Sequence, residues 1–321
     1  MADHWQPGID PSSLRYRSEL LQSLRRFFQQ RQVLEVDVPV LARSTVTDIN
    51  IESINSVVSG NSGYLQTSPE YFMKRLLAAG SGDIFCLGKA FRDAESGRRH
   101  NPEFTLLEWY RCGWDEHQLI DEVAELISQL ASLSADAQLA VTKLSYGECF
   151  KSVLGADPHS AKLASLQQMA VDASSESWAQ ESRANCLDLL FSLNVELQLP
   201  NGLVFIYDYP ACQAALAQLH LNVQGQSVSR RFEVFFNSME LANGYMELTD
   251  AAQQRQRFEK EVELRSAQNK PAVVIDEKLM AALDSGLPPC AGVALGVDRL
   301  LMQLLGTDAI DQVMAFSWQR C

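Results

Sequence analysis

Residues 84–111 read IFCLGKAFRDAESGRRHNPEFTLLEWYR, and this stretch decides the fold. Its two outer runs, 84–92 and 103–111, have the apolar and aromatic content of β-strands. The polar segment 93–101 between them has the composition of a loop. We therefore expect a long antiparallel hairpin with a charged connection.

Side-chain alternation would gather chemistry on one face of this hairpin. Gly88 and Ala90 would leave space beside the cation of Arg92. The second strand would present a row of ring, carboxylate and phenol: Phe104, Leu106, Glu108 and Tyr110. Taken alone, the pattern is more typical of a plain amphipathic hairpin with a solvated arginine, and the loop of a charged mobile turn.

The remaining elements surround this hairpin. Asp10 and Pro11 form an N-cap and first position for a helix of about five turns. Pro39 confines the β-branched run 33–41 to an edge or an interface. Further strands are expected at 64–66, from 202 to 251 and at 292–296, and helices from 67–70 onward, at 115–132, within 162–192, from 251 to 268 and from 298. Helices beside mostly antiparallel strands indicate an α+β fold.

Composition bounds the class of protein. The 321 residues are 46% hydrophobic and 21% charged, which fits one dominant globular domain spanning 1–321. No apolar run is long enough for a membrane span and the N-terminus does not resemble a signal peptide, so the expected location is the cytoplasm. Seven dispersed cysteines form no CxxC, so any metal would have oxygen ligands. The net charge of -13 does not favour a nucleic-acid partner.

Two further segments carry candidate functional residues. Gly292, Ala294 and Gly296 alternate on one face just before Asp298-Arg299, which would let a ligand approach the backbone, or would simply pack a helix closely. Glu240 and Glu247 flank Asn243-Gly244, and a turn at that dipeptide would direct both carboxylates into one cavity. Without such a turn, their odd spacing would place them on opposite faces of a strand. Glu70 is another candidate, and a binding role explains it no better than a favourable charge at a helix N-terminus does.

In combination, these segments resemble the signature motifs of class II aminoacyl-tRNA synthetases, in the same order. Residues 33–41 resemble motif 1, the dimer-interface element; residues 91–104 resemble motif 2; and residues 292–299 resemble motif 3. The sequences Arg-His-Asn-Pro-Glu-Phe-Thr at 99–105 and Glu-Leu-Ala-Asn-Gly at 240–244 are similar to the lysyl subgroup, as is Glu-Leu-Thr-Asp from Glu247. The resemblance covers residues from about 12 to 321 and is weakest in the middle.

The resemblance implies roles for individual residues. Arg92, Arg299 and Glu240 would be catalytic: Arg92 would hold the substrate carboxylate and the ATP α-phosphate, and Arg299 the γ-phosphate. Phe104 would stack on adenine. Mg²⁺ would be bound by Glu240, helped by Glu247. The other implied ATP contacts are Asp93, Ala94, His100, Asn101, Leu241 and Gly296. The implied amino-acid pocket consists of Ser68, Pro69, Glu70, Glu108, Tyr110, Asn243, Glu247 and Ala294.

Three departures from lysyl-tRNA synthetases refine this prediction. Only about 32 residues precede the motif 1 segment, too few for a β-barrel anticodon domain. Ala294 replaces an expected glycine, and Ala94 stands where a glutamate is usual. These features resemble the elongation factor P-(R)-β-lysine ligases, truncated paralogues that attach β-lysine to a lysine side chain of that translation factor.

This resemblance implies an AMP-forming ligase and a homodimer, with elongation factor P as acceptor and β-lysine, or more weakly lysine, as substrate. The resemblance argues against a tRNA partner. The alternatives are a stand-alone tRNA aminoacylator, an amide-forming synthetase, or a non-catalytic regulator that binds an amino acid; the presence of Arg92, Glu240 and Arg299 argues against the last. The segment from about 134 to 200 is expected to be a helical insertion over the active site.

Overall fold

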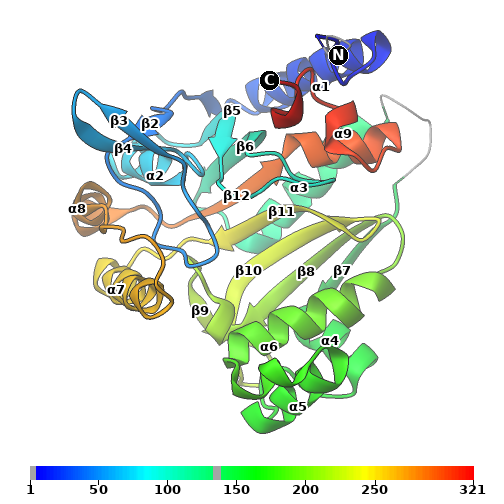
Figure 1. Ribbon diagram of the computed structural model, residues 1–321, viewed down its shortest axis with the longest axis vertical. Coiled ribbons are helices and arrows are strands. Elements are labelled where there is room, and N and C mark those ends of the chain that lie inside the picture. Colours follow the sequence, from blue (N-terminus) through cyan, green and yellow to red (C-terminus); the bar gives the residue numbers. More distant parts are fainter. Residues whose placement is uncertain (1–4, 133–138) are drawn as a thin grey trace.

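The computed structural model describes residues 5–132 and 139–321 (Figure 1). The first residues of the segment 134–200, expected to be a helical insertion, lie outside the described residues. Among the described residues, one sheet has the strand order β1-β5-β6-β12-β11-β10-β8-β7, with β9 also paired to β10. Its pairs are antiparallel except β1 with β5 and β7 with β8. The expected α+β architecture is therefore confirmed.

The strands of the large sheet are β1 (Leu34–Glu35), β5 (Ile84–Phe91), β6 (Glu103–Cys112), β7 (Val141–Ser145), β8 (Leu203–Pro210), β9 (Leu219–Leu221), β10 (Ser227–Phe236), β11 (Met239–Met246) and β12 (Cys290–Gly296). A small sheet has the order β2-β4-β3, from Leu41–Ala42, Asn61–Leu65 and Asn55–Val58 respectively. The α-helices are α1 (Pro11–Gln30), α2 (Glu70–Ala78), α3 (Glu116–Ala131), α4 (Tyr146–Leu154), α5 (Leu163–Ala173), α6 (Arg183–Leu190), α7 (Ala251–Ala267), α8 (Glu277–Gly286) and α9 (Val297–Leu305).

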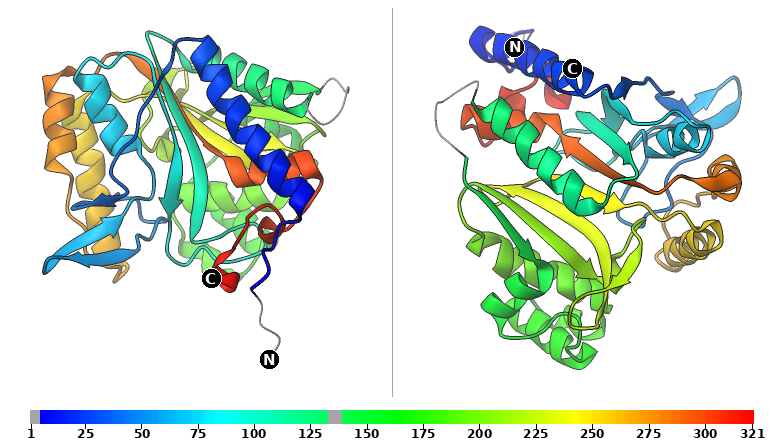
Figure 2. Two further views of the ribbon diagram at one scale, coloured as in Figure 1. Left: turned by 90° about the horizontal axis from the view of Figure 1, so that it is seen from above. Right: turned by 180° about the vertical axis from the view of Figure 1, so that it is seen from behind.

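The principal core lies on one face of the sheet. There α1, α3 and α9 pack their apolar sides onto alternate residues of the central strands, among them Leu107, Trp109, Val293 and Leu295. Seen from above, α1 lies on the opposite side of the molecule from α7 and α8 (Figure 2, left). One face of every central strand is therefore committed to the core, and the chemistry must use the other.

Helices cover the second face only at its two ends. At one end α4, α5 and α6 pack over β8 and β10, through residues such as Phe150 and Leu187. At the other end α2, α7 and α8 pack around Ile84 and Cys86 of β5. The middle strands, β6, β12 and β11, thus turn a face toward the space between these two groups of helices.

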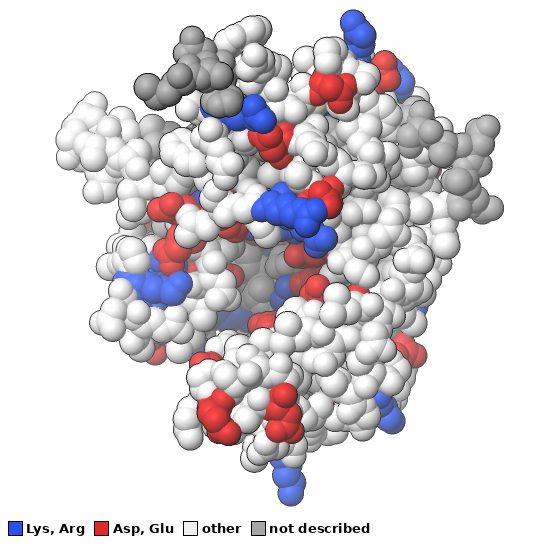
Figure 3. Space-filling model, turned by 45° about the vertical axis from the view of Figure 1, so that its right-hand side comes forward, with Lys and Arg blue, Asp and Glu red and all other residues white. Residues whose placement is uncertain are grey.

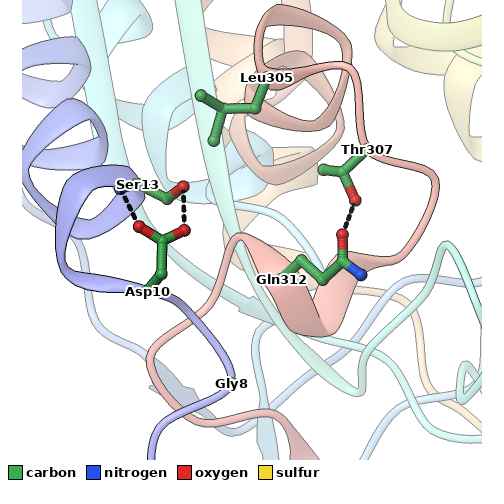
Figure 4. Close-up of a pocket in the computed structure, with 6 residues that line it drawn as sticks. All are labelled: Gly8, Asp10, Ser13, Leu305, Thr307 and Gln312. Atoms are coloured by element: carbon green, nitrogen blue, oxygen red, sulfur yellow. Dashed lines mark hydrogen bonds between the residues drawn. The ribbon is translucent and has the colours of Figure 1, made fainter.

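The two chain ends meet beside α9. The Asp10 carboxylate accepts hydrogen bonds from the backbone N–H groups of Ser12 and Ser13, as expected for an N-cap. Figure 4 shows the bonds with Ser13. The Gly8 N–H donates to the Ala315 carbonyl at 2.9 Å. A cavity of about 270 Å³ lies here, lined by Gly8, Asp10, Ser13, Leu305, Thr307 and Gln312.

Three local expectations are corrected. The run 33–41 does not form one strand: β1 pairs at the edge of the large sheet and β2 joins the small sheet. The segment 134–200 is not wholly helical, because β7 adds a parallel edge strand to β8. Asn243 and Gly244 do not form a turn, since both lie inside β11 and pair with β10 and β12.

No helix among the described residues is long and apolar enough to cross a membrane.

Candidate active site

Two rows of paired residues cross the open face of the sheet. Strand register places four residues side by side in the first row: Glu108, Ala294, Asn243 and Glu233. The second row, two residues away along each strand, consists of Tyr110, Gly292, Tyr245 and Arg231. A Cβ at Gly292 would come within 2.3 Å of the Tyr110 ring and 2.5 Å of Glu247 Oε1, so this glycine is required by close packing.

A β-bulge in β11 restores the shared face of the two glutamates that the expected turn does not provide. Ala242 pairs with Val234, but Glu240 pairs with Phe235, so Leu241 is the extra residue. The inserted residue reverses the alternation, and Leu241 and Ala242 both join the core. Glu240 therefore lies on the same side as Asn243 and the first row. The two glutamates therefore share a face, but a bulge at Leu241 places them there and not a turn at Asn243-Gly244.

Arg299, His100 and Glu240 form the first polar cluster. The Arg299 Nη2 atom lies 2.6 Å from His100 Nε2, and its Nη1 donates to the Glu240 carbonyl at 3.0 Å. The Glu240 carboxylate lies 3.5 Å from the same Nη1. Burial and the positive charges of Arg299 and Arg92 lower the pKa of His100, so a neutral imidazole accepts from Arg299. Both guanidinium groups therefore lie near one histidine.

Arg92 is placed to receive an anion. Its Cζ lies 5.1 Å from the centre of the Phe104 ring, and its Nη1 lies 3.5 Å from Glu95. Its Nε is buried and has no hydrogen-bond partner among the described residues. Because an unsatisfied buried donor is costly, this atom favours a bound acceptor such as a phosphate or carboxylate oxygen.

A buried network on the core side connects motif 2 to motif 3. Asp298 accepts from the Thr105 N–H at 2.6 Å and pairs with Arg17 at 2.7 Å. Arg17 also donates to the Thr105 hydroxyl at 2.8 Å and to the Val313 carbonyl at 3.0 Å. Asp298 precedes Arg299 and Thr105 follows Phe104, so this network joins the backbone segments that carry those two side chains. The sequence analysis did not identify Arg17.

The other end of the open face is acidic. Glu108 is 2% exposed and accepts a hydrogen bond from the Ser68 hydroxyl at 2.5 Å. The Tyr110 hydroxyl lies 3.5 Å from the same carboxylate. Burial, followed by the charge of Glu70, raises the pKa of Glu108 to about 8. Ser68, Glu70, Glu108 and Tyr110 are thus brought together as expected.

Lys74 is a central residue that the sequence analysis missed. Its ammonium lies 2.6 Å from Glu70 and 2.7 Å from Glu247, and the residue is 2% exposed. The signal was available, because Lys74 stands four positions after Glu70 in the helix beginning there. Glu247 is consequently engaged with Lys74, and its expected role beside Glu240 as a metal ligand stays a prediction.

Glu233 is a further acid near Glu240, on β10 two residues before Phe235, the strand partner of Glu240. The Glu240 charge is among the causes that raise the pKa of Glu233, after burial and against the opposing effect of Arg231. Glu233 pairs with Arg231 at 2.5 Å and accepts from the Tyr209 hydroxyl at 2.7 Å. Alternation along 231, 233 and 235 could have identified it. No group of three or more metal-ligating side chains occurs among the described residues.

The remaining predicted residues occupy supporting positions. The Asn101 side chain donates to the Glu103 carbonyl and accepts from the Trp318 N–H, so both of its ends are satisfied by backbone. Ala94 has a positive φ of 60° and its N–H is bound by Asp93 Oδ1 at 2.8 Å. Of the others, Pro69 precedes α2, Leu241 is buried, and Gly296 precedes α9.

The space-filling view shows a recess around which acidic and basic side chains gather (Figure 3). Such a surface suits a substrate that carries charges of both signs. Comparison with known proteins identifies the family: residues 11–320 match the family described as tRNA synthetases class II (D, K and N). The chain therefore belongs to this class II synthetase family.

Full-length relatives are more specific. The chain is similar to three proteins named elongation factor P--(R)-beta-lysine ligase. It is 46% identical to that of Edwardsiella ictaluri, over 98% of both chains. It is 45% identical to that of Photorhabdus laumondii, over 98% of this chain and 97% of the relative, and 45% identical to that of Vibrio cholerae, over 98% of both.

Proposed function

We propose that this protein uses ATP to activate (R)-β-lysine as an aminoacyl-adenylate and transfers the β-lysyl group to a lysine side chain of elongation factor P. The observation that carries the proposal is the pairing of two groups of side chains on one face of the sheet, Arg92 and Arg299 at one end and the buried carboxylates Glu108 and Glu247 at the other. The names of the full-length relatives supply the acceptor and the substrate.

The arginine end suits attack of a carboxylate on the ATP α-phosphorus. That reaction needs positioning and charge neutralisation more than a covalent nucleophile. The unpartnered Nε of Arg92 supports a role in holding the carboxylate and α-phosphate. Arg299 is half-buried and oriented by His100 and Glu240, which supports a role at the terminal phosphate. Phe104, beside Arg92, offers a ring on which adenine would stack.

The donor set fits Mg²⁺. Glu240, helped by a second acid on this face of the sheet, would supply carboxylate oxygens, and Mg²⁺ characteristically takes one or two carboxylates together with phosphate oxygens and water. When bound, the ion would neutralise charge on the triphosphate. Glu240 is 45% exposed, so one of its oxygens stays accessible beside the Arg299 contact.

The acidic end suits the two amino groups of a diamino acid. Glu108 has a Ser68 hydroxyl as its close partner, and the Glu70 side chain is 17% exposed. Ala294 stands between Glu108 and Asn243, so its methyl group occupies space that a glycine would leave open. Moving an amino group by one carbon changes the required shape by about one methylene, which is worth roughly 1–3 kcal/mol. We therefore infer a preference for β-lysine with residual use of α-lysine.

We also propose a homodimer in the cytoplasm. The motif 1 segment and the small sheet beside it expose apolar side chains that a partner subunit would cover. These are Leu34, Val40, Leu41, Val57 and Val58, of which Val57 is 78% exposed. An apolar group of this kind beside an edge strand is typical of a protein interface.

The decisive experiment has two stages. ATP–pyrophosphate exchange is measured with (R)-β-lysine, α-lysine and a panel of other amino acids, and elongation factor P is then analysed by mass spectrometry after incubation with enzyme, ATP and β-lysine. We expect exchange with β-lysine above α-lysine and a β-lysyl mass increment on one lysine of the factor. Exchange driven by a different amino acid, or charging of tRNA in place of the factor, would refute the proposal.

A further inference from the structure

The cluster around Lys74 has a charge composition that the proposed chemistry does not by itself explain. Lys74, on α2, lies between Glu70 of the same helix and Glu247, which follows β11. Glu108 of β6 completes the cluster, because the charges of Glu70 and Glu247 both act on it. Lys74, Glu108 and Glu247 are each at most 2% exposed, so water screens these charges poorly.

Charge counting shows what the cluster lacks. Three carboxylates and one ammonium leave two negative charges without compensation in a buried space. Burying unpaired charge is expensive, so an empty cluster must take up protons or bind cations. Burial and the charge of Glu70 raise the pKa of Glu108 to about 8 and, against the opposing charge of Lys74, the pKa of Glu247 to about 7.

We propose that Lys74 is a specificity-determining residue that sets the net charge of the amino-acid pocket at two negative charges, matched to the two ammonium groups of a diamino acid. The substrate carboxylate is balanced separately by Arg92. Without Lys74 the cluster would hold three uncompensated negative charges, one more than the substrate can neutralise. This inference rests on the proposed function, because it assumes a diamino acid as substrate.

Charge matching predicts a reversal of sign that simple packing does not. K74M leaves one negative charge too many, and E247Q leaves one too few, so each variant should raise KM for β-lysine by at least about tenfold. The double variant K74M/E247Q restores two negative charges and should return KM to within about threefold of the unmodified protein. Removal of Lys74 is thus harmful in the native protein and beneficial in the E247Q background.

The assay is ATP–pyrophosphate exchange at varied β-lysine concentration, with KM for ATP measured in parallel and expected to stay unchanged. R255M/E277Q serves as the matched control, because that ion pair of 2.7 Å is exposed and joins α7 to α8. Thermal unfolding of every variant establishes folding. Should K74M fail to fold, the comparison of E247Q with K74M/E247Q carries the same sign test.

Three outcomes separate the hypotheses. Recovery in the double variant supports charge setting by Lys74. A double variant as poor as the weaker single variant, or K74M with unchanged KM for β-lysine, overturns it. Absence of exchange with β-lysine in the unmodified protein refutes the proposed function instead. The variants are then compared with whichever diamino acid does drive exchange. If no diamino acid drives exchange, charge matching by Lys74 is refuted as well.

Discussion

Replacing Glu108 by glutamine should stabilise the folded protein while impairing its binding of the amino acid. The Glu108 carboxyl has a pKa of about 8 in the folded chain against an ordinary value of 4.5. Between those values the unfolded chain loses this proton and the folded chain keeps it, so folding stability falls as pH rises through that window. The free energy of unfolding that is lost in this way grows from about 1 kcal/mol at pH 5 to about 3 kcal/mol at pH 7.

E108Q removes this titration and keeps an oxygen that can accept from Ser68. Its unfolding free energy should therefore exceed that of the unmodified protein by about 2 kcal/mol more at pH 7 than at pH 5. Urea denaturation at the two pH values measures the difference directly. E35Q is the control, because Glu35 forms an exposed pair with Arg25.

The same change should damage amino-acid binding. In the unmodified protein KM for β-lysine should fall as pH rises toward 8, because Glu108 must ionise to receive an ammonium group. In E108Q KM should be high and nearly independent of pH over this range. An E108Q protein that is destabilised equally at pH 5 and pH 7, or that keeps the pH dependence of KM, would refute the reasoning.

Three further changes test the surrounding structure. R17M should lower the unfolding free energy by about 3 kcal/mol, as for other broken buried ion pairs, and should raise KM for ATP. R17K should recover part of both losses. The exposed control R25M should change the unfolding free energy by no more than about 1 kcal/mol and leave KM for ATP unchanged. G292A should destabilise by about 1–3 kcal/mol and raise KM for β-lysine because its methyl would strike Tyr110 and Glu247; G88A, whose Cβ meets nothing closer than 3.9 Å, should be tolerated. V57E should shift the protein from dimer to monomer in sedimentation velocity, and a V57E dimer of unchanged stability would argue against the proposed interface.

Local sequence was sufficient for most of the elements and for the family. Alternation in 84–92 and 103–111 identifies the hairpin, and Asp10-Pro11 identifies the start of α1, because both signals depend on neighbouring residues alone. The ordered motifs identify the class II synthetase family even though each motif alone was ambiguous. Residues such as Arg92 and Arg299 could be named at this stage because they lie within those motifs.

Only the tertiary structure decided which charges meet. Glu247 and Lys74 lie far apart in the chain, and their pairing depends on how α2 packs over the end of β11. The shared face of Glu240 and Asn243 depends on a bulge opposite Val234, which arises from the register between two strands. Periodicity describes a side chain relative to its own strand. It contains no information on register or on helix packing, so it could supply the acids of this site but not their partners.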